Sequence, residues 1–139
     1  IHKTFKYHGA EHKTIACYEA ELELTVENVR KQIRFHPRCG TSFIFLVVLL
    51  SIIIGMFLPW KNLWARFGLQ LLMLIPETSI GYELIKLAGR YDNIFTRIIS
   101  APGIWLQHIT TCEPDDPQIE VAIAALKPCI PENKEDDKW

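Results

Sequence analysis

The residues best suited to chemistry lie close to the start of the chain, in the pentapeptide His8-Gly9-Ala10-Glu11-His12. The pentapeptide has the form H-x-x-E-H, and positions i and i+4 of a helix share a face, so both imidazoles could reach one metal ion. The carboxylate of Glu11 is placed to act as a base toward water, as in the inverted zinc-protease motif. A polar helix start, with His8 and Glu11 as capping groups, explains the same residues equally well.

A second group with ligand chemistry is the run His36-Pro37-Arg38-Cys39-Gly40-Thr41. A His and a Cys in a Pro/Gly loop make a plausible metal-ligand pair, and a cytoplasmic thiol favours metal binding or catalysis over a disulfide. Taken alone, the run is better explained as a loop that starts a membrane helix, with Arg38 at the lipid headgroups and Cys39 buried. When His8 and His12 are considered as well, on the same side of the membrane, a metal site shared by the two groups competes with the loop explanation. Its nitrogen and sulfur ligands favour zinc.

Acidic residues further along the chain offer additional candidate ligands. Glu83 lies in a helical context, and Glu77 is a weaker candidate. An ionisable group at membrane depth is costly and functional by default, whereas at the interface Glu83 and Lys86 form only an i,i+3 pair. A later acidic group could bind a hard cation or orient a ligand, although a helix dipole explains its spacing better: Glu113, Asp115, Asp116 and Glu120.

The elements that must position these residues are helices, and the most distinctive of them is apolar. The stretch from Cys39 to Trp60 carries no charge, and at about 1.5 Å per residue it spans roughly 33 Å, close to the hydrocarbon thickness of a bilayer. A buried core helix or strand is the alternative, but a soluble helix of this length would show a polar stripe, and only Ser51 and Gly55 interrupt this one. A helix stop and interfacial aromatics follow: Pro59, Trp60 and Trp64.

A second apolar stretch, Leu63 to Leu87, is interrupted at Pro76. It is either a kinked or discontinuous span that returns after a short turn, or an interfacial half-helix, and the short turn favours an antiparallel hairpin. Lys and Arg are dense before the first span and after the second stretch, so both ends are expected in the cytoplasm. A third segment, Ile94 to Ile109, is too interrupted for a span and is interpreted as interfacial or as lining the site.

The flanking segments have the patterns of soluble helices. One helix is expected over 9–21, and Thr25 is expected to cap a short one with Val26, Val29 and Ile33 on one face. Asp115 and Asp116 before Pro117 predict a further helix start. The apolar face of that helix and its stop are Ile119, Ala122, Ile123, Leu126 and Pro128. Cys17 is expected to be packed rather than ligating, and no structural disulfide is predicted.

These patterns predict an all-α integral membrane protein with a transmembrane helical hairpin and short cytoplasmic helices. The expected parts are a cytoplasmic segment over 1–38, a hairpin over 39–90 broken at Pro76, an interfacial segment and amphipathic helix over 91–130, and a charged tail over 131–139. Its expected place is the bacterial inner membrane.

The composition excludes two classes of protein. The sequence has fifteen basic and sixteen acidic residues among 139, and this balance argues against nucleic-acid binding by bulk charge. A hydrophobic share of 49% excludes wholesale disorder.

Three separated strings, FKYHGAEHKTIACYE, LTVENVRKQIRFHPRCGTSF and TTCEPDDPQIEVAIAAL, together resemble the YqhQ-like family of bacterial membrane proteins. That family has no known function and is described as predicted metal-dependent enzymes, so the resemblance implies a metal without naming a reaction. Members usually carry a further N-terminal region with a GGQAVIEGVMMRGP-like motif. Since the sequence starts at Ile1, we expect it to be a fragment or a processed product. Gene neighbours of the family imply a link to translation or membrane-protein biogenesis.

Two hypotheses follow from the residues and the resemblance. In the first, the chain is a membrane-embedded, metal-dependent hydrolase that faces the cytoplasm. Its ligands would be His8, His12 and His36 or Cys39, with Glu83 as a further candidate, while Glu11 would be the general base and Arg38 would stabilise an anion. In the second, it is a non-enzymatic accessory partner at a translocon, a ribosome or another membrane assembly, including a homo-oligomer, with the His and Cys residues structural.

Overall fold

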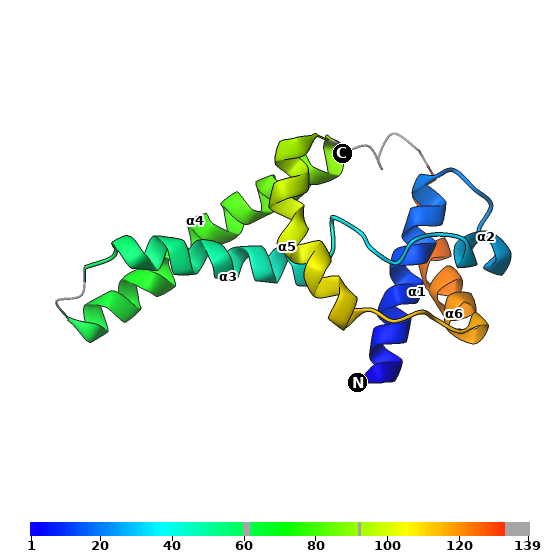
Figure 1. Cartoon of the computed structure of the whole chain (residues 1–139), viewed down its shortest axis with the longest axis horizontal. Helices are drawn as coiled ribbons and strands as arrows, with labels where there is room; N and C mark the ends of the chain where they lie inside the picture. The colour runs from blue at the N-terminus through cyan, green and yellow to red at the C-terminus, as the bar shows by residue number, and fades with distance from the viewer. Residues whose placement is uncertain (60–61, 92, 133–139) are drawn as a thin grey trace. The chain divides into compact units, whose positions relative to one another are not determined.

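A computed structural model describes residues 1–59, 62–91 and 93–132 of the chain (Figure 1). Every regular element in these ranges is a helix, so the all-α prediction is confirmed. The elements are α1 (His2–Glu19), α2 (Val26–Arg30), α3 (Gly40–Phe57), α4 (Leu63–Arg90), α5 (Ile94–Thr110), α6 (Asp116–Leu126) and the short 3-10 helix η1 (Lys127–Cys129). The chain divides into two compact units, residues 37–104 and the segments on either side of them, and each unit is described by itself.

The first unit packs α1, α2 and α6 around a small apolar core. The core residues are Ala10, Cys17, Val29, Ile119 and Ile123. Helix α2 begins as predicted, because the hydroxyl of Thr25 accepts a hydrogen bond from the N–H of Asn28 (3.3 Å). Since α2 already ends at Arg30, Ile33 lies beyond it and is 68% exposed rather than on its apolar face.

Helix α6 also begins where the sequence predicts. The side chain of Gln118 reaches back and accepts a hydrogen bond from the N–H of Asp115 (2.8 Å), and Pro117 occupies the first turn. Its buried apolar residues are Ile119 and Ile123, as the periodicity indicates. The charged tail predicted over 131–139 lies outside the described residues from 133 onward.

A close backbone crossing joins the two ends of the first unit. A Cβ at Gly9 would overlap the carbonyl oxygen of Cys112, and the N–H of Cys112 donates a hydrogen bond to the carbonyl of Phe5 (2.9 Å). The segment after α5 therefore runs directly against α1, and only a glycine at position 9 leaves room for it. The expected helix over 9–21 in fact starts earlier, at His2, and ends at Glu19.

Helices α3 and α4 form an antiparallel hairpin in the second unit. A Cβ on Gly81 would lie 3.0 Å from Cγ2 of Val47, and the hydroxyl of Ser51 donates a hydrogen bond to Glu77. From Val47 to Ser51 the chain advances along α3 while the facing residues of α4 step back from Gly81 to Glu77, so the two helices are antiparallel. Helix α3 ends before Pro59, as predicted, whereas Trp60 lies outside the described residues.

Helix α4 runs from Leu63 to Arg90 with Pro76 inside it, where the sequence predicts a break. A proline removes only its own N–H from the helical hydrogen bonds, so the rest of a long helix can continue. The hydroxyls of Thr78 and Ser79 also donate to the carbonyl of Ile75 (both 2.9 Å), which adds bonds in the turn around the proline. Helix α5 likewise continues through Pro102.

Helix α3 is long and apolar enough to cross a membrane, and it is the one such helix in the described part of the chain. Only 17% of its apolar window is buried inside the protein. The exposed large side chains on it are Ile44, Val48, Ile52, Ile53, Met56 and Phe57. A surface of this kind is costly in water and needs a cover.

Candidate histidine site

Two of the predicted ligands, His8 and His12, lie against each other on one face of α1. Their ring centroids are 4.3 Å apart in an edge-on arrangement. Nδ1 of His8 lies 2.9 Å from the carbonyl oxygen of Thr110, and Nδ1 of His12 lies 2.7 Å from that of Arg34. A carbonyl oxygen only accepts, so both Nδ1 atoms are the donors, and in a neutral ring Nε2 is then the nitrogen with the lone pair. This is the hydrogen-bond pattern that orients metal-binding histidines.

The third predicted ligand, His36, is brought to the same place by the chain after α2. Its ring centroid lies 6.0 Å from that of His12. The fully buried side chain of Gln107 fixes its backbone on both sides: the N–H of His36 donates to Oε1 (2.9 Å), and Nε2 of Gln107 donates to the carbonyl of His36 (2.7 Å). The end of α5 therefore positions His36.

Glu19 completes the polar face around the histidines. Its carboxylate oxygen Oε2 lies 3.2 Å from Nε2 of His36, so that nitrogen donates to Glu19. His8, His12 and Glu19 follow the spacing i, i+4, i+11. At about 100° per residue these positions lie within roughly 40° of one another on a helix.

Sequence reasoning missed Glu19 and Gln107. The spacing of Glu19 on the helical face of the two histidines could have revealed it. Gln107 gives no comparable signal, because it is 71 residues from His36 and only the folded chain brings the two together.

Glu11, the predicted base, is exposed on α1, whereas His12 next to it is buried. An exposed carboxylate is accessible to water and to a substrate, and Glu11 takes part in none of the ion pairs found within residues 1–59, 62–91 and 93–132. Gly9 and Ala10 within the same motif are buried and serve the packing of α1. Within the motif, Gly9 and Ala10 therefore serve packing, whereas His8, Glu11 and His12 supply the polar groups.

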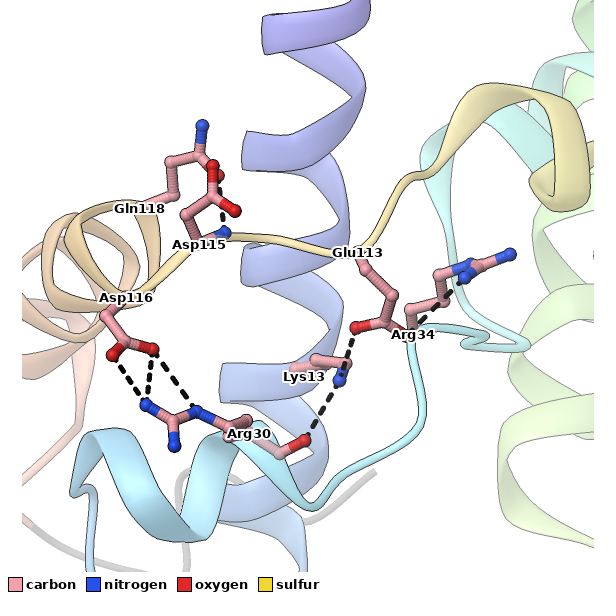
Figure 2. Close-up of polar contacts among 7 residues, drawn as sticks. All are labelled: Lys13, Arg30, Arg34, Glu113, Asp115, Asp116 and Gln118. Atoms are coloured by element: carbon pink, nitrogen blue, oxygen red, sulfur yellow. Dashed lines mark hydrogen bonds and ion pairs between the residues drawn. The ribbon is translucent and has the colours of Figure 1, made fainter.

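A set of ion pairs, called the ionic frame here, connects segments of the first unit that are distant in the sequence. Figure 2 shows those made by Lys13, Arg30 and Arg34. The buried Lys13 places Nζ 2.7 Å from Oε2 of Glu113 and 3.0 Å from the carbonyl of Arg30. The other oxygen of Glu113 lies 3.4 Å from the guanidinium of Arg34. Glu113 thus bridges α1 to the segment that carries His36.

The remaining acids of this group also pair with cations. Both carboxylate oxygens of Asp116 accept from the guanidinium of Arg30, and Asp115 lies 2.6 Å from Nζ of Lys6. These carboxylates therefore act as counter-charges, whereas Glu120 is exposed on α6. The ion pairs give the acidic group a structural explanation that its spacing alone does not reveal.

The other predicted site residues belong to the second unit. Cys39 is buried at the start of α3, with Sγ 3.0 Å from the hydroxyl of Thr41, and Arg38 lies against Gly89. Glu77 is fully buried against α3, whereas Glu83 is exposed. The sequence ranks these two acids in the opposite order, because it cannot show which face of α4 meets α3.

Cys17 is packed in the core of the first unit, as expected. Burial raises the pKa of its thiol, which makes it less reactive. On the exposed surface of α2, the hydrogen bond from Lys31 lowers the pKa of Glu27. Neither group takes part in the histidine site.

Fold and site together define a small all-α protein with a histidine cluster in one unit and an apolar helical hairpin in the other. The chain belongs to the family described as "Protein of unknown function (DUF1385)", which matches residues 1–132. It is similar to the uncharacterized protein YqhQ of Bacillus subtilis (strain 168), with 43% identity over 127 residues. The match covers 91% of this chain and 40% of that relative. The family resemblance is therefore confirmed, and no solved structure matches the chain.

Proposed function

We propose that the α3–α4 hairpin crosses the bilayer of the bacterial inner membrane and holds the first unit at its cytoplasmic side. The support is an arrangement that suits lipid rather than water: apolar side chains point outward from α3, and polar ones point inward. Inside the hairpin, Nε2 of Gln70 donates to the hydroxyl of Ser51 (2.8 Å), which donates to the buried Glu77. Polar groups at membrane depth need such internal partners.

We further propose that the first unit binds a divalent metal ion through its histidines, with zinc fitting imidazole ligands. The observation that carries this proposal is the pair of Nδ1 hydrogen bonds from His8 and His12 to backbone carbonyls. They set the tautomer in which both Nε2 atoms can act as ligands. The candidate for a third ligand within this unit is His36, whose ring centroid lies 6.0 Å from that of His12.

The reaction class that this donor set supports best is hydrolysis. A bound zinc ion supplies Lewis acidity toward water and carbonyl oxygens. The exposed carboxylate of Glu11 accepts the proton of the attacking water and returns it to the leaving group. Glu19 holds the Nε2 proton of His36 and so keeps that ring in one orientation.

The test of metal binding is metal analysis of the purified chain, combined with cobalt substitution. We expect about one metal ion per chain, loss of it in His12→Ala, and retention in the control His2→Ala, whose side chain is exposed at the start of α1. A thiolate-to-cobalt charge-transfer band that disappears in Cys39→Ser would assign the third ligand to Cys39. A cobalt spectrum without a thiolate band, unchanged in Cys39→Ser and lost in His36→Gln, would assign the third ligand to His36. Absence of stoichiometric metal in the parent chain would end the proposal.

The non-enzymatic role is the second candidate, and one observation favours it. The same hydrogen bonds that orient the histidines also tie α1, the segment before α3 and the end of α5 together. A metal at that place would serve the fold of an accessory membrane protein equally well. Glu11→Gln separates the two roles, because a hydrolase loses its activity with metal retained, whereas an accessory protein keeps its function in cells.

A further inference from the structure

The first part of α5, residues 94–104, carries apolar side chains on the outside of the second unit. Its large exposed side chains, each between 64% and 75% exposed, are Ile94, Phe95 and Ile98. Thr96 between them is buried. At about 100° per residue, Ile94, Ile98 and the exposed Ala101 lie within roughly 60° of one another on the helix. Apolar residues therefore face outward here and a polar one faces inward, the reverse of the pattern on a helix that borders water.

The opposite side of α5 packs on the hairpin at the start of α3. A Cβ on Gly103 would lie 2.6 Å from Cβ of Ser42, in the first turn of α3, so only a glycine allows this crossing. Figure 1 shows the first part of α5 crossing the start of α3 rather than running along it. Residues of α3, α4 and α5 line a shallow recess behind the crossing: Phe45, Leu49, Ile85, Ile99 and Ser100. The first part of α5 is thus fixed at one end of the hairpin, with its apolar face turned away from it.

This crossing sets the depth of α5 in the membrane that we propose α3 to span. Helix α3 begins at Gly40, so Ser42 lies where the span enters the hydrocarbon from the cytoplasmic side. With 17 residues, α5 is about 25 Å long, which is shorter than the roughly 30 Å of hydrocarbon that a second crossing would require. The contact with Ser42 therefore places the first part of α5 at the boundary between headgroups and acyl chains.

We propose that the first part of α5 lies along the cytoplasmic leaflet, with Ile94, Phe95 and Ile98 among the acyl chains of the bilayer. The proposal rests on the membrane crossing proposed above and adds a second lipid contact beside it. Ile44 and Val48 in the first turns of α3 are exposed as well, so both helices expose apolar side chains at this end of the hairpin. A helix of this kind buries its apolar face about 5–10 Å into the boundary between headgroups and acyl chains.

Lipid fits this face better than a second copy of the chain does. Even at about 200 Å² for each large side chain, three residues that are 64–75% exposed offer roughly 400 Å². Each partner in a standard protein interface buries about 800 Å². The face is therefore too small to hold a stable dimer on its own, whereas burial among acyl chains requires no matching surface.

The test uses the full chain reconstituted in phosphatidylcholine vesicles that contain a phosphatidylcholine with a diazirine on one acyl chain. Illumination couples this lipid to the side chains next to it, and mass spectrometry identifies the coupled residues. We expect coupling at Ile94, Phe95 and Ile98, and also at Ile52 of α3, which is the reference for the crossing itself. A diazirine near the lipid carbonyl should favour Ile98, and one near the chain end should favour Ile52. The exposed Val121 of α6 is the control, which a water-soluble diazirine should label and the lipid should not.

The coupling pattern separates failure of this proposal from failure of the membrane crossing. Coupling at Ile52 without coupling at Ile94 and Ile98 would overturn the lipid contact of α5 in favour of a protein cover such as a second copy, and it would leave the crossing intact. Equal coupling of the lipid to Val121 and Ile98 would also overturn it, because the reagent would then report exposure alone. Absence of coupling at Ile52 would instead overturn the crossing, and the proposal with it.

Ile98→Asp tests the apolar face directly. Because the Ile98 side chain is exposed, the substitution removes little packing within the chain but places a charge among the acyl chains. The equilibrium between lipid-bound and released α5 should shift by about tenfold or more, so coupling at Ile94 should fall relative to Ile52. Val121→Asp makes the same change on α6 and should leave this ratio unchanged. An unchanged ratio in Ile98→Asp, or an equal fall in Val121→Asp, would overturn the assignment of this face to lipid.

Discussion

At the scale of single residues, Gly9 shows how a motif can combine packing with chemistry. It separates His8 from the rest of the H-x-x-E-H pentapeptide, and the carbonyl of Cys112 lies directly over it. The hydrogen bond from His8 to Thr110 depends on the same crossing, because Thr110 and Cys112 are parts of one short segment. A change at Gly9 should therefore disturb the histidine as well as the fold.

We predict that Gly9→Ala lowers the free energy of unfolding of the first unit by about 1–3 kcal/mol, the usual cost of overpacking. Alkylation of the buried Cys17, followed by mass spectrometry through a urea series, reports on this unit alone. The control is Gly68→Ala in α4, where a Cβ would meet no atom within 4 Å and where alanine is neutral or favourable by up to about 1 kcal/mol. Equal alkylation of Cys17 in Gly9→Ala and the parent chain would show that the crossing is not tight.

At the scale of elements, the clamp between Gln107 and His36 connects the end of α5 to the segment that carries the third histidine. Both backbone groups of His36 bond to one buried side chain. Replacement by methionine keeps the volume but leaves the N–H and the carbonyl of His36 without these bonds. Each buried group left unpaired costs about 1–3 kcal/mol.

We therefore predict that Gln107→Met increases amide hydrogen exchange at His36 and weakens metal binding by about 10–100-fold, the usual effect of losing an outer partner of a ligand. The matched control is Gln32→Met, because the half-buried side chain of Gln32 donates one long hydrogen bond, to the carbonyl of Asn28 (3.3 Å). Unchanged exchange at His36 in Gln107→Met would mean that the clamp does not hold the segment, and unchanged metal affinity would remove His36 from the site.

The elements also show what a sequence can and cannot predict. The long apolar helix, the Thr25 cap and the start of α6 follow from local rules, and the structure has all three. The burial of Glu77 rather than Glu83 depends on packing against α3. Hydrogen bonds such as that between His36 and Gln107 join distant segments, and no local pattern encodes them.

At the scale of the whole molecule, the chain separates its polar chemistry from its apolar surface. The histidine cluster and the ionic frame lie in the unit built from both ends of the chain, whereas the exposed apolar side chains of α3 lie in the inserted hairpin. Each unit has its own stabilising interactions: ion pairs and a small core in one, internal polar bonds and helix packing in the other. A ligand that binds only one unit should therefore stabilise that unit preferentially.

We predict that zinc slows amide hydrogen exchange in α1, α2 and α6 and leaves the interiors of α3 and α4 unchanged. At a free zinc concentration about 100 times the dissociation constant, binding stabilises the ligand-bound unit by about 2.7 kcal/mol, which corresponds to about 100-fold slower exchange through its global opening. The measurement is exchange of the reconstituted chain with and without zinc, and His12→Ala is the control that should show no protection. Equal protection of the hairpin would mean that the two units open together. Protection that persists in His12→Ala would place the metal elsewhere, because the Nε2 atom of that histidine would then be dispensable.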